Sequence, residues 1–120
     1  MKEVKYRAWD TEKEKMAEVI SINLSDGEVR MEDEECRVWS APAPYVCRLM
    51  EYIGHKDKYG KEIYEGDIVK LFEYKVLDSI ILPEEIVIIN DIRVGCDTLI
   101  PSQYMEVIGN IYENPELLEN

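Results

Sequence analysis

The stretch YIGHKDKYGKEIYEGDIVKL, residues 52–71, holds the clearest structural pattern in the chain. Apolar runs at 45–53 and 67–74 stand on either side of a polar segment that carries three glycines at six-residue intervals. Two β-strands joined by a reversal explain this pattern. The sequence therefore predicts the turn chemistry of a small β-domain.

Each of these glycines has a predicted place in the reversal. Gly54 releases the end of the first strand, and Gly60 after Tyr59 supplies a position with φ > 0. Gly66 allows a sharp turn before Asp67 restarts the pairing. We predict Gly54, Gly60, Gly66 and Asp67 as structural turn residues.

The same loop does not fit a phosphate-binding device. Such a loop has closely spaced glycines, a Lys followed by Ser or Thr, and a helix N-terminus, none of which GHKDKYGKEIYEG offers. Asp67 and Glu65 could form a pair of catalytic carboxylates. An Asp directly after a turn glycine more often accepts hydrogen bonds from backbone N–H groups, so we predict that Asp67 fixes the turn.

Other strands are expected from alternating apolar and polar residues. They cover 3–9, 16–24, 85–94 and 104–112, and Pro115 starts a short helical turn near the C-terminus. APAP at 41–44 is expected as a loop. Residues 77–85 are ambiguous, because a short apolar run does not distinguish strand from helix. The fold class is mostly β.

The net charge of the chain limits which classes of partner are expected. The chain has 120 residues, 26 Asp and Glu against 14 Lys and Arg, and a net charge of −12. This charge disfavours nucleic acid and anionic membranes as partners. Residues 26–35 hold six acids against Arg30 and are expected to be a solvated, mobile charge run rather than a calcium loop.

The cysteines and the chain start indicate a reducing cytoplasm. The three cysteines are widely spaced, no C-x-x-C is present, and MKEVKYRAWD lacks the apolar run of a signal peptide. No apolar run reaches the length of a membrane span. The cysteines are Cys36, Cys47 and Cys96.

No metal, cofactor or catalytic site is predicted. His55 is the single histidine, and Asp57 and Cys47 are its conceivable partners in a metal or nucleophilic site. Zinc would need four ligands, and no paired ligand spacing is present. The preferred readings are an exposed loop histidine and a buried strand thiol at Cys47.

Tyrosine is unusually common, with eight tyrosines against one phenylalanine. Tyrosine rings bury apolar area and keep a polar tip, which suits the rim of a small barrel and a protein interface alike. We predict an interaction surface that includes Trp39, Tyr45, Tyr59 and Tyr64.

Three stretches, in this order, closely resemble the YopX family of bacteriophage and prophage proteins. They are VKYRAWD (4–10), RLMEYIGHKDKYGKEIYEGDIVKL (48–71) and EVIGNIYENPELL (106–118). The family pattern usually has Leu where His55 stands and Asn where Tyr59 stands. The resemblance implies a single domain over residues 1–120, a small SH3-type β-barrel with additional strands, a phage or prophage origin, and no established activity.

Three classes of function follow from these observations. The leading hypothesis is an accessory protein that contacts a host or phage protein, or a second copy of itself. The second is a nucleic-acid role, either direct binding through Lys5, Arg7 and the 56–61 loop, which is not expected, or a carboxylate surface that imitates DNA. The third is an enzyme, using His55, Asp57, Asp67 and a cysteine.

Overall fold

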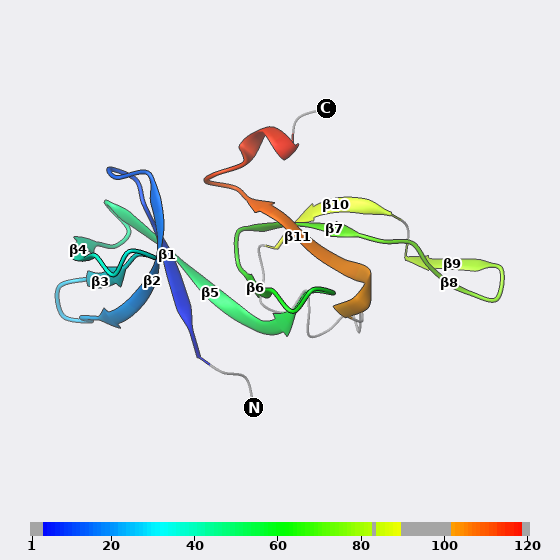
Figure 1. The fold of residues 1–120 in the computed structure, drawn as a ribbon, viewed down its shortest axis with the longest axis horizontal. Coiled ribbons are helices and arrows are strands. Elements are labelled where there is room, and N and C mark those ends of the chain that lie inside the picture. The colour runs from blue at the N-terminus through cyan, green and yellow to red at the C-terminus, as the bar shows by residue number, and fades with distance from the viewer. Residues whose placement is uncertain (1–3, 83, 90–101, 119–120) are drawn as a thin grey trace. The chain divides into compact units, whose positions relative to one another are not determined.

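The computed structural model describes residues 4–82, 84–89 and 102–118, and strands dominate them (Figure 1). The prediction of a mostly-β fold is confirmed. The chain divides into two compact units, Val4–Glu51 and a second unit that runs onward from Tyr52. The division falls inside strand β5 (Cys47–Lys56). Because the strand is continuous there, no linker marks the division in the sequence.

The N-terminal unit, Val4–Glu51, is an antiparallel meander that ends on the first half of β5. The strand order is β4-β3-β2-β1-β5, and β1 lies between β2 and β5. Strands β1 to β4 pair in sequence because short turns join them, whereas β5 returns to pair with β1. The strands are β1 (Tyr6–Asp10), β2 (Lys15–Ile22), β3 (Glu28–Glu32) and β4 (Val38–Pro42).

The core of the N-terminal unit comes from alternate residues on one face of this meander. Small side chains dominate it, and two larger ones, Val29 and Met31, fill the space between them. Trp39 packs partly against the same cluster. The buried members are Ala8, Ala17, Val29, Met31, Ala41 and Cys47.

Two segments of this unit differ from their predicted structure. The acidic run 26–35 is not a mobile charge run throughout, because β3 forms within it and buries Val29 and Met31 completely. Their alternation with outward charged residues is a strand pattern that the local charge obscured. Residues 41–42, expected in a loop, end strand β4, which lies at the edge of the sheet, where a proline is tolerated.

The second unit is built around β7 (Asp67–Leu71), which lies between β10 (Glu85–Ile88) and β11 (Met105–Asn110). Both neighbours are antiparallel to β7. A short strand, β6 (Glu62–Tyr64), pairs with the later part of β5. The buried cluster of this unit consists of Ile53, Ile63, Val69, Leu71, Ile89 and Met105.

The remaining elements are short. Strands β8 (Tyr74–Val76) and β9 (Ser79–Leu82) form a separate two-stranded hairpin, and 3₁₀-helices cover Ser102–Tyr104 and Pro115–Leu118. The helical turn at Pro115 is as predicted. Within the ambiguous segment 77–85, residues 77–78 form the turn of this hairpin and 79–82 its second strand, while residue 83 lies outside the described residues. Residues 90–94 of the predicted strand 85–94 lie outside the described residues.

The described strands form open sheets and do not close into the SH3-type barrel that the family resemblance implied. The longest sheet has the order β4-β3-β2-β1-β5-β6, so β4 and β6 are its two edges and do not pair with each other. A barrel requires such edges to meet. The mostly-β prediction therefore holds, while the barrel is a correction.

Candidate interaction site

Asp57 organises the loop between β5 and β6. Its Oδ1 accepts the N–H groups of Tyr59 and Lys61, each at 2.9 Å, and the Gly60 N–H donates to the Asp57 carbonyl at 3.0 Å. With Gly60 at a φ of 81°, this is a tight turn followed by a left-handed residue. The arrangement places the Tyr59 ring at the tip of the loop.

The second oxygen of Asp57 joins this loop to a distant strand. Oδ2 accepts the N–H of Val107 in β11 at 2.9 Å. Burial alone would raise the pKa of Asp57, but the N–H donors of Val107, Lys61 and Tyr59 outweigh it and the pKa is lowered. Asp57, considered from sequence only as a partner of His55, therefore holds the loop in place. The spacing of Asp57 and Gly60 in DKYG is the signal for this turn.

The turn before β7 is built by Gly66 and Asp67. Gly66 has a φ of 89°, its N–H donates to the Ile89 carbonyl, and its carbonyl accepts the Ile111 N–H at 2.9 Å. Asp67 is buried, and its Oδ2 accepts the N–H of Tyr64 at 2.7 Å. The turn thus joins segments on both sides of β7, and the Asp67 carboxylate accepts a backbone N–H group.

Gly54 differs from its predicted place. It lies inside β5 rather than at the end of a strand, and its φ is 90°. The register with β6 shifts between the pairs Tyr52–Tyr64 and Lys56–Glu62, so β5 has extra residues there. Such a bulge favours glycine because it needs a positive φ. The strand continues to Lys56 through this bulge.

The four predicted surface residues differ in their exposure to solvent. The Tyr45 and Tyr59 side chains are 82% and 70% exposed, but these residues belong to different units. Tyr64 is only 7% exposed, and its ring lies 5.6 Å from that of Tyr52, centroid to centroid. Tyr64 is therefore a core residue, and its assignment to the interaction surface is wrong.

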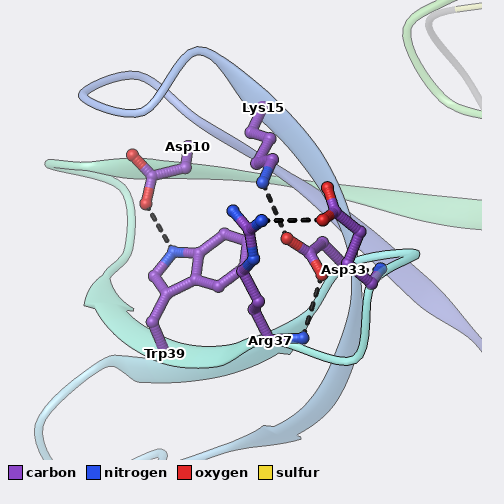
Figure 2. Close-up of polar contacts among 6 residues, drawn as sticks. Asp10, Lys15, Asp33, Arg37 and Trp39 are labelled. Atoms are coloured by element: carbon purple, nitrogen blue, oxygen red, sulfur yellow. Dashed lines mark hydrogen bonds and ion pairs between the residues drawn. The ribbon is translucent and has the colours of Figure 1, made fainter.

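Trp39 is half-buried and held in a polar network (Figure 2). Its Nε1–H donates to Oδ2 of Asp10 at 2.7 Å. The ammonium groups of Lys13 and Lys15 lie 5.5 and 5.9 Å from the centre of its ring, within the range of cation–π attraction. The ring is fixed by these contacts.

The turns on either side of Trp39 are also tied together. Lys15 donates to Oδ2 of Asp33 at 2.7 Å, while Oδ1 of Asp33 accepts the N–H groups of Arg37 and Glu35 (Figure 2). The hydrogen bond from Lys15 lowers the pKa of Asp33 to about 2, with the Arg37 N–H as the next cause. The Lys15–Asp33 ion pair therefore joins the start of β2 to the β3–β4 turn.

A second aromatic and cationic cluster lies in the second unit. The Lys58 ammonium is 4.4 Å from the Phe72 ring centre and 5.3 Å from that of Tyr59. Lys70 is 5.1 Å from the Phe72 ring centre and 3.5 Å from Oε1 of Glu84. Sequence reasoning missed this cluster, because Lys58 and Phe72 meet only through the pairing of distant segments.

The metal and nucleophilic hypotheses involve the histidine and the cysteines. Within 4–82, 84–89 and 102–118, no three His, Cys, Asp or Glu side chains are grouped as metal ligands would be. Cys47 is buried, burial raises the pKa of its thiol, and the nearby Asp10 carboxylate adds to this. Cys36 is exposed and free, and Cys96 lies outside the described residues.

In the part of the chain that the structure describes, no helix is long and apolar enough to cross a membrane.

The fold and these sites define a small antiparallel β protein whose buried carboxylates fix turns. The chain belongs to the YopX family, because the model of that family, described as YopX protein, matches residues 5–119. No curated protein matches the chain.

A solved structure has a similar fold. The crystal structure of protein EF1440 from Enterococcus faecalis is 26% identical to this chain, with a TM-score of 0.60. The alignment covers 99% of this chain and 100% of the other. The likeness therefore extends over both units.

Proposed function

We propose that this chain is a phage or prophage accessory protein that works in the bacterial cytoplasm by binding another protein, without chemistry of its own. Membership of the YopX family supports the phage origin. The observation that carries the binding role is the exposure of large aromatic rings at loop tips, 82% at Tyr45 and 70% at Tyr59. Tyrosine is enriched at protein interfaces because it offers apolar area with a polar tip.

The use of the acidic side chains supports the absence of chemistry. A general acid or base must have its carboxylate free to reach a substrate. Asp57 instead accepts three backbone N–H groups, and Asp67 accepts that of Tyr64. These carboxylates stabilise turns.

The test is affinity purification of the tagged chain from host cytosol at low and moderate salt, with Tyr45→Ala and Tyr59→Ala beside the wild type. We expect at least one of these variants to lose a protein that the wild type retains. Tyr45→Phe and Tyr59→Phe, which keep the ring, are the matched controls. Retention of no protein by the wild type at either salt concentration would contradict the proposal.

A nucleic-acid role is the second candidate, and the cluster around Phe72 is the observation that favours it. Lys58 and Lys70 both lie near the Phe72 ring, and Lys58 also lies near the Tyr59 ring, as in sites that stack bases and hold phosphates. Against it stand the pairing of Lys70 with Glu84 and the net charge of −12. The same acidity supports the alternative in which the surface imitates DNA.

A further inference from the structure

The loop between β5 and β6 carries exposed lysines around an exposed ring. The lysines are Lys56, at the end of β5, Lys58 and Lys61. Tyr59, at the tip of the loop, is 70% exposed. In the part of the chain that the structure describes, none of these three lysines forms an ion pair with a carboxylate. The loop is therefore a basic patch on a chain whose net charge is −12.

The acid within this loop, Asp57, does not cancel the lysines at the surface. Asp57 is only 4% exposed, and both of its carboxylate oxygens accept backbone N–H groups. Its charge is therefore compensated inside the loop by N–H dipoles, while the lysine side chains stay exposed. Glu62, which follows the loop, is half-buried, and its Oε1 accepts the Tyr64 hydroxyl at 3.3 Å. A loop that is nearly neutral in sequence thus presents mainly positive charge.

The Lys58 ammonium is held in place beside two rings. It lies 4.4 Å from the centre of the Phe72 ring and 5.3 Å from that of Tyr59. The backbone N–H of Lys58 donates to the Met105 carbonyl at 2.9 Å, which ties the loop tip to β11. An ammonium has three N–H donors, so one that rests against a ring still has donors for a carboxylate. A group that is already ordered loses less entropy on binding.

These features define the chemistry of the partner. Lysines beside an exposed phenol ring are complementary to an extended protein segment rich in Asp and Glu. Nucleic acid fits less well, because it carries one charge per about 1.7 Å of duplex and would bring them against Glu62 and against Glu84, which pairs with Lys70. Salt screens exposed charges beyond about 8 Å, so a short acidic segment meets mainly the loop.

We propose that the β5–β6 loop is a docking site for an acidic segment of a different protein. Lys58 and Lys61 bind its carboxylates, and the Tyr59 ring packs against the apolar parts of its side chains. This inference rests on the proposed protein-binding function, assigns that function to the Tyr59 loop and adds the partner chemistry. A second copy of this chain is a poor occupant, because a two-fold contact through the loop would bring the lysines of both copies together.

The test uses a fluorescein-labelled oligoglutamate peptide, titrated with the purified full chain at low and physiological salt and followed by anisotropy. Oligoglutamine and oligothymidine of the same length are the comparison ligands. The variants are Lys58→Gln, Lys61→Gln and the double variant, with Lys75→Gln as the matched control. Lys75 is an exposed lysine in β8, so its replacement makes the same change in net charge on a different element. Circular dichroism checks that each variant is folded.

We expect each single loop variant to weaken the binding of oligoglutamate by about threefold and the double variant by about tenfold, with Lys75→Gln unchanged. Equal affinity of the wild type and the double variant would overturn the docking site, as would equal affinity for oligoglutamate and oligoglutamine. Tighter binding of oligothymidine would assign the loop to nucleic acid and contradict the proposal. Self-association that depends on Lys58, measured by sedimentation, would assign the loop to a second copy instead.

The affinity purification from host cytosol separates this inference from the proposed function. We expect the double variant Lys58→Gln/Lys61→Gln to lose a protein that the wild type and Lys75→Gln retain. Equal retention by all three would overturn the loop as the docking site and leave the proposed function standing. If the wild type retains no protein, the proposed function fails, while the peptide titration still decides whether the loop binds carboxylates.

Discussion

Gly66 shows how one residue supports several segments. Its backbone bonds to Ile89 and Ile111 require the chain to turn at a φ of 89°, a conformation that β-branched residues adopt only at high cost. We predict that Gly66→Val lowers the free energy of unfolding by at least about 2 kcal/mol. Thermal denaturation checks this, with Gly66→Ala as the milder control. An unchanged midpoint for Gly66→Val would contradict it.

Asp57 gives a prediction about pH. Because its pKa is lowered in the folded state, its charge stabilises the fold above the ordinary aspartate pKa of about 3.9, and this contribution is lost as pH falls through the folded pKa. In Asp57→Asn, the amide oxygen can still accept the N–H groups of Tyr59 and Lys61, but the NH₂ group would face the N–H of Val107. We expect a loss of about 1–3 kcal/mol at pH 7.

The comparison is made by denaturant titration at several pH values. The difference between wild type and Asp57→Asn should be largest above pH 5 and shrink below about pH 4. Asp33, whose pKa is also lowered, titrates in both proteins and so cancels from the difference. A difference that does not change with pH would show that the charge of Asp57 is not what stabilises the loop.

The glycine turns could be predicted from sequence, whereas the burial of Tyr64 could not. The positive φ of Gly60 and Gly66 follows from local chemistry that the sequence displays. The burial of Tyr64 depends on packing against Tyr52, and that contact forms through strand pairing. Local patterns therefore predicted the turns, while the faces on which side chains lie needed the sheet.

At the level of elements, β3 is the instructive case. Its acids Glu28 and Glu32 made the segment look like a solvated charge run, yet Val29 and Met31 are fully buried between them. The alternation of apolar and charged residues indicates a strand, while the net charge of the segment favours a solvated loop. Glu18 in β2 even lies directly opposite Glu32, a like-charge pair that a strand forms only when its other face is well buried.

The core role of β3 predicts its response to truncation. Met31→Ala should lower the free energy of unfolding by about 2–5 kcal/mol, because it leaves a cavity in a core of small side chains. Chemical denaturation measures this loss. Arg30→Ala, on the exposed face of the same strand, is the control and should change stability by less than about 0.5 kcal/mol. Equal effects of the two variants would argue against a buried β3.

At the level of the whole molecule, the prediction of one domain over residues 1–120 stays a prediction. The structure has two compact units joined through one continuous strand, β5. Since pairing in both units uses that strand, we expect a single unfolding transition. Thermal unfolding is followed by calorimetry, which reports on the whole chain, and by tryptophan fluorescence. Both tryptophans, Trp9 and Trp39, lie in the N-terminal unit, so their fluorescence reports on that unit alone. A fluorescence transition separate from the calorimetric one would show that the units unfold independently.

The net charge gives the last prediction, on nucleic acid. The cations that direct binding would use are Lys5 and Arg7 in one unit and the Lys58–Phe72 cluster in the other, where Lys70 is already paired with Glu84. Phosphate binding is favourable because several unpaired lysines and arginines neutralise phosphates and release the counterions bound to them. A net charge of −12 also repels a polyanion such as DNA. We therefore expect a dissociation constant weaker than about 100 μM for duplex and single-stranded DNA at physiological salt.

Fluorescence titration of labelled oligonucleotides, from low to moderate salt, measures this constant. The variant Glu84→Gln, which frees Lys70 from its ion pair, is the sensitive comparison, because it should strengthen any binding at the Phe72 cluster. Low-micromolar binding that weakens steeply with salt would make direct nucleic-acid binding the leading function. If no DNA binds but the protein displaces DNA from a host DNA-binding protein, the carboxylate surface acts as an imitation of DNA, and the acidity of the chain is itself the functional feature.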